Sequence, residues 1–139
     1  MTVLVDTSIW SEAFRRRAVD DVSANVHELR ELIAEGNAII IGPIRQELLS
    51  GIRHRAQFEK LRDRLRAFPD AEIKTLDFER AAEHFTCCRR NGIQGSNTDF
   101  LICAAAERLH VAIFTADDDF VHFSKHLPIR LHRSRFDEE

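Results

Sequence analysis

The sequence predicts one α/β domain over residues 1–139, built on a mainly parallel, five-stranded sheet that is flanked by helices. Short apolar runs alternate along the chain with longer stretches of helical period. The runs at 2–5 and 111–114 are almost wholly apolar, as expected for strands that helices bury on both faces. Strands joined by helices run parallel, and 139 residues fit a single domain.

Local signals place the elements along the chain. Strands are expected at residues 2–5, 38–41, 72–76 (a weaker edge strand), 111–114 and 129–131. Helices are expected from residue 8, over 20–34, from 43, over 54–67, over 77–90 and over 98–109, with a short helix after the fourth strand. Gly36 ends one of these helices and Pro43 begins the next, while the turn at residues 95–97 caps the helix that follows it. We expect Ile33 and Phe78 to face the core.

The composition limits the classes of function. A net charge of −3 argues against a general binder of polyanions. The 20 basic residues include only three lysines, so 17 are arginines, which favours either a phosphate-containing partner or a GC-rich genome. No apolar run approaches the roughly 20 residues that span a bilayer. The first residues do not resemble a secretion signal, so we expect a cytoplasmic protein.

Four acidic residues lie near the carboxyl ends of predicted strands. Asp6 ends the first strand, and Asp117 lies just past the strand at 111–114. Glu47 is one turn into the helix after the second strand, and Asp99 lies in the first turn of its helix, where the dipole favours a carboxylate. Ligands of such sheets bind beyond the carboxyl ends of the strands. We therefore expect the four side chains to converge, although each alone could be a turn, capping or solvated residue.

Converging carboxylates need a cation. Like charges a few ångströms apart repel by roughly 1–4 kcal/mol per pair even when solvent screens them. Oxygen ligands select hard ions such as Mg²⁺ or Mn²⁺, and no histidine or cysteine joins the four by position, which argues against zinc. One or two such ions could activate water and stabilise a leaving oxyanion at a phosphodiester. The sequence therefore predicts a metal-dependent phosphodiesterase site.

Four blocks of sequence resemble the signature blocks of PIN domains. They are Val-Asp-Thr-Ser at 5–8, Gln-Glu-Leu-Leu-Ser-Gly at 46–51, Asp-Phe-Leu-Ile-Cys-Ala-Ala-Ala at 99–106 and Phe-Thr-Ala-Asp-Asp-Asp-Phe at 114–120. In order, spacing and chain length the sequence is also similar to the VapC-type toxins of type II toxin–antitoxin systems. The resemblance implies a sheet of order 3-2-1-4-5, RNA cleavage that depends on Mg²⁺ or Mn²⁺, a homodimer, and inhibition by a small DNA-binding antitoxin.

The resemblance also implies roles for particular residues. The catalytic metal ligands would be Asp6, Glu47, Asp99 and Asp117. Asp119 would act beside them or on a second ion, and the hydroxyls of Ser8 and Thr115 would steady the carboxylates. The run from Asp117 to Asp119 leaves open which of its members contacts metal.

Basic and aromatic residues near the first helix could serve binding. Arg15, Arg16 and Arg17, with the basic face of residues 54–66, could contact RNA phosphates around the acidic pocket, or they could form an ordinary solvated surface. Trp10 and Phe14 lie one turn apart and could pack in the core, which we favour, or hold the antitoxin.

Two other functions compete with RNA cleavage. One is a metal-dependent phosphatase or DNA nuclease on the same scaffold, but the first strand lacks the Asp-x-Asp-x-Thr motif of aspartyl-phosphate enzymes. The other is a binding module without chemistry, either receiver-like or a degenerate PIN domain. A receiver needs a lysine after a late strand, and the only lysines are Lys60, Lys74 and Lys125. A degenerate PIN domain would normally have lost some of the carboxylates.

Overall fold

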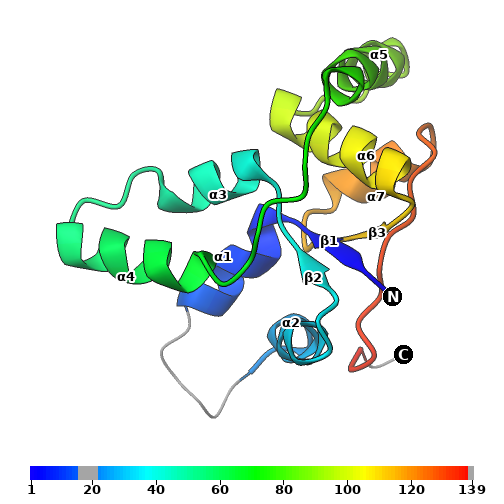
Figure 1. The fold of residues 1–139 in the computed structure, drawn as a ribbon. Helices are drawn as coiled ribbons and strands as arrows, with labels where there is room; N and C mark the ends of the chain where they lie inside the picture. Colours follow the sequence, from blue (N-terminus) through cyan, green and yellow to red (C-terminus); the bar gives the residue numbers. More distant parts are fainter. Residues whose placement is uncertain (16–21, 138–139) are drawn as a thin grey trace.

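The computed structural model describes residues 1–15 and 22–137 and has the expected α/β architecture (Figure 1). Its strands are β1 (Val3–Val5), β2 (Ala38–Ile39) and β3 (Ala112–Phe114). Its helices are α1 (Thr7–Arg15), α2 (Ala24–Ala34), α3 (Gly42–Leu49), α4 (Arg55–Leu65), α5 (Thr75–Arg90), α6 (Asn97–Leu109) and α7 (Asp119–Ser124). Among the described residues, no helix is both long and apolar enough to cross a membrane.

The sheet is parallel but has three strands, in the order β2-β1-β3. The prediction of five regular strands is therefore wrong. The two outer positions of the expected 3-2-1-4-5 order hold single parallel bridges, Ile40 with Asp70 and Ile113 with Leu131. The edge strand expected at 72–76 is absent because Lys74 is already the N-cap of α5 and donates its backbone N–H to the Asp77 carboxylate at 2.8 Å. The helix thus begins inside the segment predicted as a strand.

Helices bury both faces of this small sheet. Figure 1 shows α6 and α7 on one side of the strands and α2 on the other, with α5 packed outside α6 and the α3–α4 hairpin projecting beyond β2. All three residues of β1 are inaccessible to solvent, as is Ile113 of β3. Burial of such apolar side chains, at about 25 cal/mol per Å² of area removed from water, is the main force that holds the layers together.

Two apolar residues expected to face the core are on the surface. Ile33 is 38% exposed and Phe78 is 57% exposed. The inward stripe of α2 passes through Leu29 and Leu32, so Ile33, one residue further, is rotated about 100° away from it. The buried stripe of α5 includes Ala81 but not Phe78.

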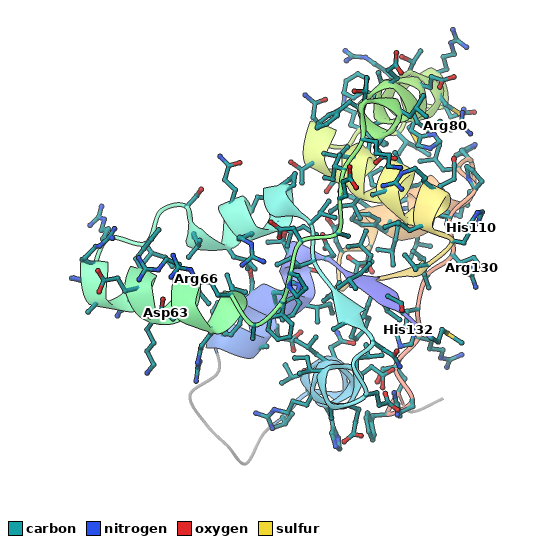
Figure 2. All side chains as sticks on the ribbon, viewed as in Figure 1. Asp63, Arg66, Arg80, His110, Arg130 and His132 are labelled. Atoms are coloured by element: carbon teal, nitrogen blue, oxygen red, sulfur yellow. The ribbon has the colours of Figure 1, made fainter. Side chains whose placement is uncertain are left out.

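The C-terminal segment is fastened to α2 by charged side chains. Glu28 of α2 is 1% exposed, and its carboxylate contacts His132 Nε2 at 2.5 Å and accepts a hydrogen bond from Arg135 Nε at 2.6 Å. Figure 2 shows His132 on the segment that passes beside α2. The ring of Phe136 stacks on His27 with 3.7 Å between centroids. This ionic cluster joins parts of the chain that are about a hundred residues apart.

Candidate functional site

Asp6 is fixed where β1 ends. Val5 pairs with Phe114 in the sheet, and the Asp6 N–H donates to the Phe114 carbonyl at 2.8 Å, so the two strands end side by side. The Asp6 side chain is buried, at 5% exposure, and its Oδ2 accepts hydrogen bonds from Ser8 Oγ at 2.7 Å and from Thr115 Oγ1 at 2.8 Å. Within the described residues Oδ1 accepts no hydrogen bond from another side chain.

The same two hydroxyls organise the loop after β3. Ser8 Oγ accepts the N–H of Ala116 at 2.9 Å, and Thr115 Oγ1 accepts the N–H of Asp117 at 3.0 Å. Asp117 Oδ1 in turn accepts the N–H of Asp119 at 2.9 Å. Because each hydroxyl donates to Asp6 and accepts from this loop, the position of Asp117 depends on that of Asp6.

Asp99 enters the site from the start of α6. Ser96 is the N-cap of this helix, and its Oγ accepts the Asp99 N–H at 3.1 Å, while Asp99 Oδ2 accepts the Ser96 N–H at 3.0 Å. This reciprocal pair is a capping box, which satisfies two backbone donors that a helix start otherwise leaves free. It uses one oxygen of Asp99, so capping and ligand binding are compatible here, although from sequence alone we treated them as alternatives.

The carboxylates act on one another electrostatically. Partial desolvation raises the pKa of Glu47, an exposed residue of α3, and the negative charges of Asp6 and Asp99 raise it further. Burial also raises the pKa of Asp99, against the lowering effect of its hydrogen bonds with Ser96, and Asp6 and Asp117 add to the rise. The charges of four of the five acidic residues predicted as metal ligands, Asp6, Glu47, Asp99 and Asp117, thus bear on the same region of the protein. The fifth, Asp119, begins α7, and Asp118 is exposed beside it.

Within residues 1–15 and 22–137, no positive side chain pairs with the carboxylates of this acidic edge. Among the described residues, none of the four carboxylates forms an ion pair with lysine, arginine or histidine within 4.0 Å. Nor do any three acidic, histidine or cysteine side chains of the described part stand close enough together to hold a metal ion as they are. The donors are nonetheless all carboxylate oxygens, and one oxygen of Asp6 is free of side-chain hydrogen bonds. Such a donor set fits Mg²⁺ or Mn²⁺ better than zinc.

A groove of about 860 Å³ opens beside Ser8, between α1, the end of α3 and α4. Its lining residues are Ser8, Ser11, Phe14, Arg15, Leu48, Ile52, Gln57, Lys60, Leu61 and Arg64. Among the described residues, the lining therefore combines apolar side chains with three positive ones and no negative one. We call this hollow the basic groove.

Only part of the predicted basic surface faces the basic groove. Arg55 pairs with Glu59 and Arg62 with Asp63, whereas Lys60 and Arg64 have no ion pair among the described residues. Arg15 also lines the groove, but the predicted RNA contacts Arg16 and Arg17 lie outside the described residues. The sequence indicates the basic face of 54–66 but does not show which of its side chains form ion pairs.

Trp10 belongs to the core. It is 1% exposed, and its Nε1 donates to the Val5 carbonyl at 3.1 Å. Its ring stacks with that of Phe14, with centroids 6.2 Å apart. Phe14 is partly exposed and lines the basic groove, so of this pair only Phe14 can contact a partner.

Comparison with known proteins gives the family. The PIN domain family model matches residues 3–126. The chain therefore belongs to the PIN domain family. PIN domains are nucleases, which agrees with an acidic edge suited to phosphodiester chemistry. A search of curated protein sequences finds no significant match.

Solved structures share the fold across almost the whole chain. FitAcB from Neisseria gonorrhoeae is 17% identical with a TM-score of 0.76, and the match covers 98% of this chain and 100% of that one. VapBC2 from Rickettsia felis, bound to a DNA fragment from its promoter, is 20% identical with a TM-score of 0.74 over 95% and 98%. A toxin–antitoxin complex from Klebsiella pneumoniae is 20% identical with a TM-score of 0.62 over 86% and 90%. At these identities the likeness establishes the fold.

Proposed function

We propose that this protein is a metal-dependent endoribonuclease and that it acts as a VapC-type toxin. The observation that supports the proposal is the acidic edge, where Glu47 and Asp99 have pKa values raised by neighbouring carboxylates and where Asp6, Glu47, Asp99 and Asp117 form no ion pair among the described residues. Carboxyl groups with raised pKa values, such as Glu47 and Asp99, near the carboxyl ends of parallel strands are typical of functional sites. The PIN domain match supports nuclease chemistry at this edge.

Each part of the site has a task in this proposal. Asp6, Glu47, Asp99 and Asp117 would hold Mg²⁺ or Mn²⁺, with Asp119 contributing to the same ion or to a second one. Such an ion, when bound, lowers the pKa of a water molecule and stabilises negative charge on a phosphodiester. Ser8 and Thr115 keep Oδ2 of Asp6 in place, so that Oδ1 remains available.

RNA must reach this negative edge from a positive rim. Arg15, Lys60 and Arg64 line the basic groove that starts at Ser8, and their charges can bind the phosphates that flank the reacting bond. Phe14 and Leu61 also line the groove, and they offer an aromatic ring and an apolar side chain against which unpaired bases can pack. These features favour single-stranded RNA, because its bases are unpaired and can stack on protein side chains.

Cleavage of labelled single-stranded RNA tests the proposal. We expect cutting in Mn²⁺, none in EDTA, and a loss of more than about 100-fold in Asp6→Asn and Asp117→Asn, beyond the 10–100-fold typical of residues that only orient a ligand. Asp118→Asn is the matched control, because Asp118 is exposed and does not raise the pKa of Asp99 or Glu47. Undiminished cutting in EDTA contradicts the mechanism. Preferential cutting of a DNA strand of the same sequence favours a DNA nuclease, and no cutting of either favours a binding module.

The biological role that we propose is that of a cytoplasmic toxin, held inactive by a small DNA-binding antitoxin and active as a homodimer. Support comes from the fold of the matched structures, one of which is a toxin–antitoxin complex. Expression in a bacterium should arrest growth, and Asp6→Asn should relieve the arrest at equal protein level. An equally strong arrest by that variant would show that toxicity does not depend on the acidic edge. Light scattering of the purified protein tests the dimer.

A further inference from the structure

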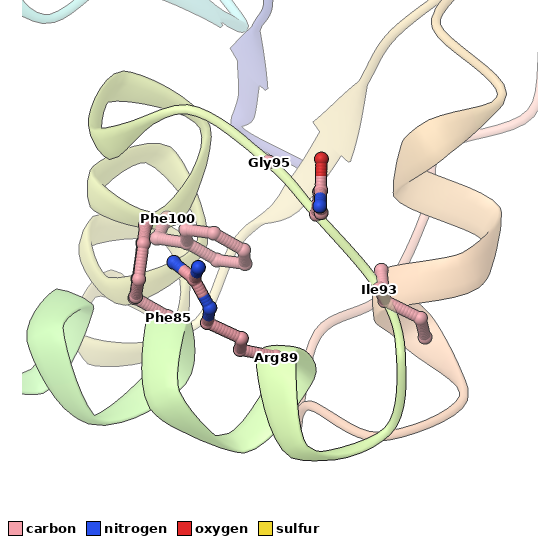
Figure 3. Close-up of a pocket in the computed structure, with 6 residues that line it drawn as sticks. Phe85, Arg89, Ile93, Gly95 and Phe100 are labelled. Atoms are coloured by element: carbon pink, nitrogen blue, oxygen red, sulfur yellow. The ribbon is translucent and has the colours of Figure 1, made fainter.

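A second hollow, of about 210 Å³, lies between α5 and the loop that leads to α6 (Figure 3). The residues that line it are Phe85, Arg89, Ile93, Gln94, Gly95 and Phe100. Its size is below the roughly 300–1,000 Å³ of pockets that take drug-sized ligands. The hollow therefore has room for a group about as large as one planar ring system.

Two aromatic rings form its walls, and a glycine sets its shape. The rings of Phe85 and Phe100 meet edge to face with centroids 5.6 Å apart, and Phe100 packs on Phe123 at 4.9 Å. Phe100 is 1% exposed, so its ring is held firmly in place. A Cβ on Gly95 would come within 2.6 Å of the Phe123 ring and 2.9 Å of the Phe100 ring. Any larger residue at Gly95 would displace these rings.

The polar side chains at the hollow, Arg89 and Gln94, form no ion pair and no side-chain hydrogen bond within the described residues. The Arg89 guanidinium lies 5.8 Å from the centre of the Phe85 ring and forms no ion pair there, whereas Arg80 of the same helix pairs with Glu107 at 2.9 Å. Figure 3 shows the Arg89 side chain reaching from α5 towards Phe100. The Gln94 amide is exposed and makes no side-chain hydrogen bond in the described part. An amide offers both donors and an acceptor to a ligand.

The hollow and the acidic edge both include residues at the start of α6. Gly95 precedes Ser96, whose N–H is bound by the Asp99 carboxylate at 3.0 Å, and Phe100 follows Asp99. The aromatic wall and the acidic ligand thus belong to the same first turn of α6, which rises about 5.4 Å per turn. A strand that is cleaved at the acidic edge can place a neighbouring base in this hollow.

We propose that this hollow binds one unpaired base of the RNA substrate, and that Arg89 and Gln94 select which base it is. The inference rests on the proposed ribonuclease function. Unpaired bases are recognised by stacking on aromatic rings or on arginine planes, together with hydrogen bonds to their edges. Phe85 and Arg89 supply the stacking surfaces, and the guanidinium and amide supply the hydrogen bonds. An apolar side chain of a protein partner could stack in the hollow but would form no hydrogen bond with Arg89 or Gln94.

The first arm of the test uses a pool of random single-stranded RNA with Mn²⁺, and the cut sites are read by sequencing. Wild-type protein should prefer one base beside the cut by about tenfold, within the range of side-chain recognition of a base. In Arg89→Met that preference should fall below about twofold while cutting continues. Arg90→Met is the matched control, because Arg90 is exposed and does not line the hollow. An equal preference in Arg89→Met, or no preference in the wild type, overturns the proposal but leaves the ribonuclease standing.

The second arm does not depend on cleavage. The four nucleoside monophosphates are titrated in turn against ¹⁵N-labelled protein, and one of them should shift the backbone amides of Gln94 and Gly95. That shift should be lost in Arg89→Met and kept in Arg90→Met. Absence of any shift with all four overturns the proposal, as does a shift of those amides by N-acetyl-phenylalanine amide alone, which would assign the hollow to a protein side chain. A wild type that cuts no RNA refutes the ribonuclease, and this arm then decides on the hollow by itself.

Discussion

Buried carboxylates at the acidic edge and in the ionic cluster at α2 have opposite electrostatic surroundings. Glu28 is 1% exposed and meets two positive or ionisable groups, Arg135 at 2.6 Å and His132 at 2.5 Å. Asp6 is 5% exposed and, among the described residues, receives only hydroxyl and backbone donors, while its charge bears on Glu47 and Asp99. Removing a carboxylate from water is costly, and an opposite charge normally offsets that cost.

The difference separates a structural use of charge from a functional one. At α2 the compensating charges are part of the chain, so the cluster stabilises the fold in every state of the protein. At the acidic edge the compensation is incomplete without a ligand, so the fold tolerates a repulsion that a cation can relieve. We therefore expect removal of a carboxylate charge to change stability in opposite directions in the two regions.

The largest change in stability should come from the ionic cluster. Glu28→Ala should lower the free energy of unfolding by about 3 kcal/mol, the lower end of the range for breaking a buried ion pair, because Arg135 keeps Glu35 as a second partner. Urea denaturation measures the change. Glu31→Ala, also on α2 and without an ion pair in the described part, should stay within about 0.5 kcal/mol. Equal losses in both variants would mean that helix propensity, rather than ion pairing, sets the cost.

A smaller loss is expected at the hydroxyl that joins β1 to the loop after β3. Ser8→Ala removes a hydrogen bond of 2.7 Å to Asp6 and one of 2.9 Å from Ala116, and should cost about 1.5 kcal/mol, as for a hydrogen bond to a charged group. RNA cleavage should fall by about 10–100-fold because the Asp6 carboxylate loses its orientation. Ser11→Ala, one turn along α1, is the control for stability, and Thr86→Ala on α5, outside the lining of the basic groove, is the control for cleavage. Unchanged cleavage in Ser8→Ala would show that Thr115 alone positions Asp6.

Neutralising the acidic edge should stabilise the protein slightly. Glu47→Gln removes the repulsion of Glu47 with Asp6 and Asp99, and in EDTA at pH 7 should raise the free energy of unfolding by less than about 1 kcal/mol, because Glu47 is partly solvated. Glu79→Gln, an exposed change on α5, provides the baseline. A loss of stability close to that of Glu28→Ala would erase the distinction between the two regions.

The smallest effect concerns pH. Glu47 and Asp99 have raised pKa values in the folded protein, so the folded state holds their protons more tightly than the unfolded state does. Their contribution to stability therefore falls as the pH rises through the ordinary values of 4.5 and 3.8 towards the raised ones. The stability gained by Glu47→Gln should vanish below pH 4.5 and grow towards pH 7. If the stability difference between Glu47→Gln and the wild type does not change with pH, charge repulsion is not its cause.

Features that depend on local sequence were predicted well. The ends of β1 and β3 follow from short apolar runs, and they bring Asp6 close to Thr115 because parallel strands in register end at one edge. The Ser96 cap is likewise local, since an N-cap acts within three residues.

Features that depend on distant partners were predicted poorly or missed. The edge strand expected at 72–76 is replaced by a single bridge between Ile40 and Asp70, because α5 begins inside that segment and the strand pattern does not reveal this. The cluster around Glu28 joins residues over a hundred positions apart. The hollow at Gly95 depends on the close approach of Phe123 from α7. Spacing along the sequence carries no signal for contacts of this kind.

Calorimetric titration of Mn²⁺ tests most directly the claim that the acidic edge awaits a cation. At pH 7 the wild type should bind Mn²⁺, and Asp6→Asn and Asp99→Asn should each weaken binding by more than about tenfold, as expected when an ion loses a ligand. Glu28→Gln, a carboxylate compensated within the chain, should leave binding unchanged. Absence of Mn²⁺ binding by the wild type, or equal affinity in Asp6→Asn, would contradict the account.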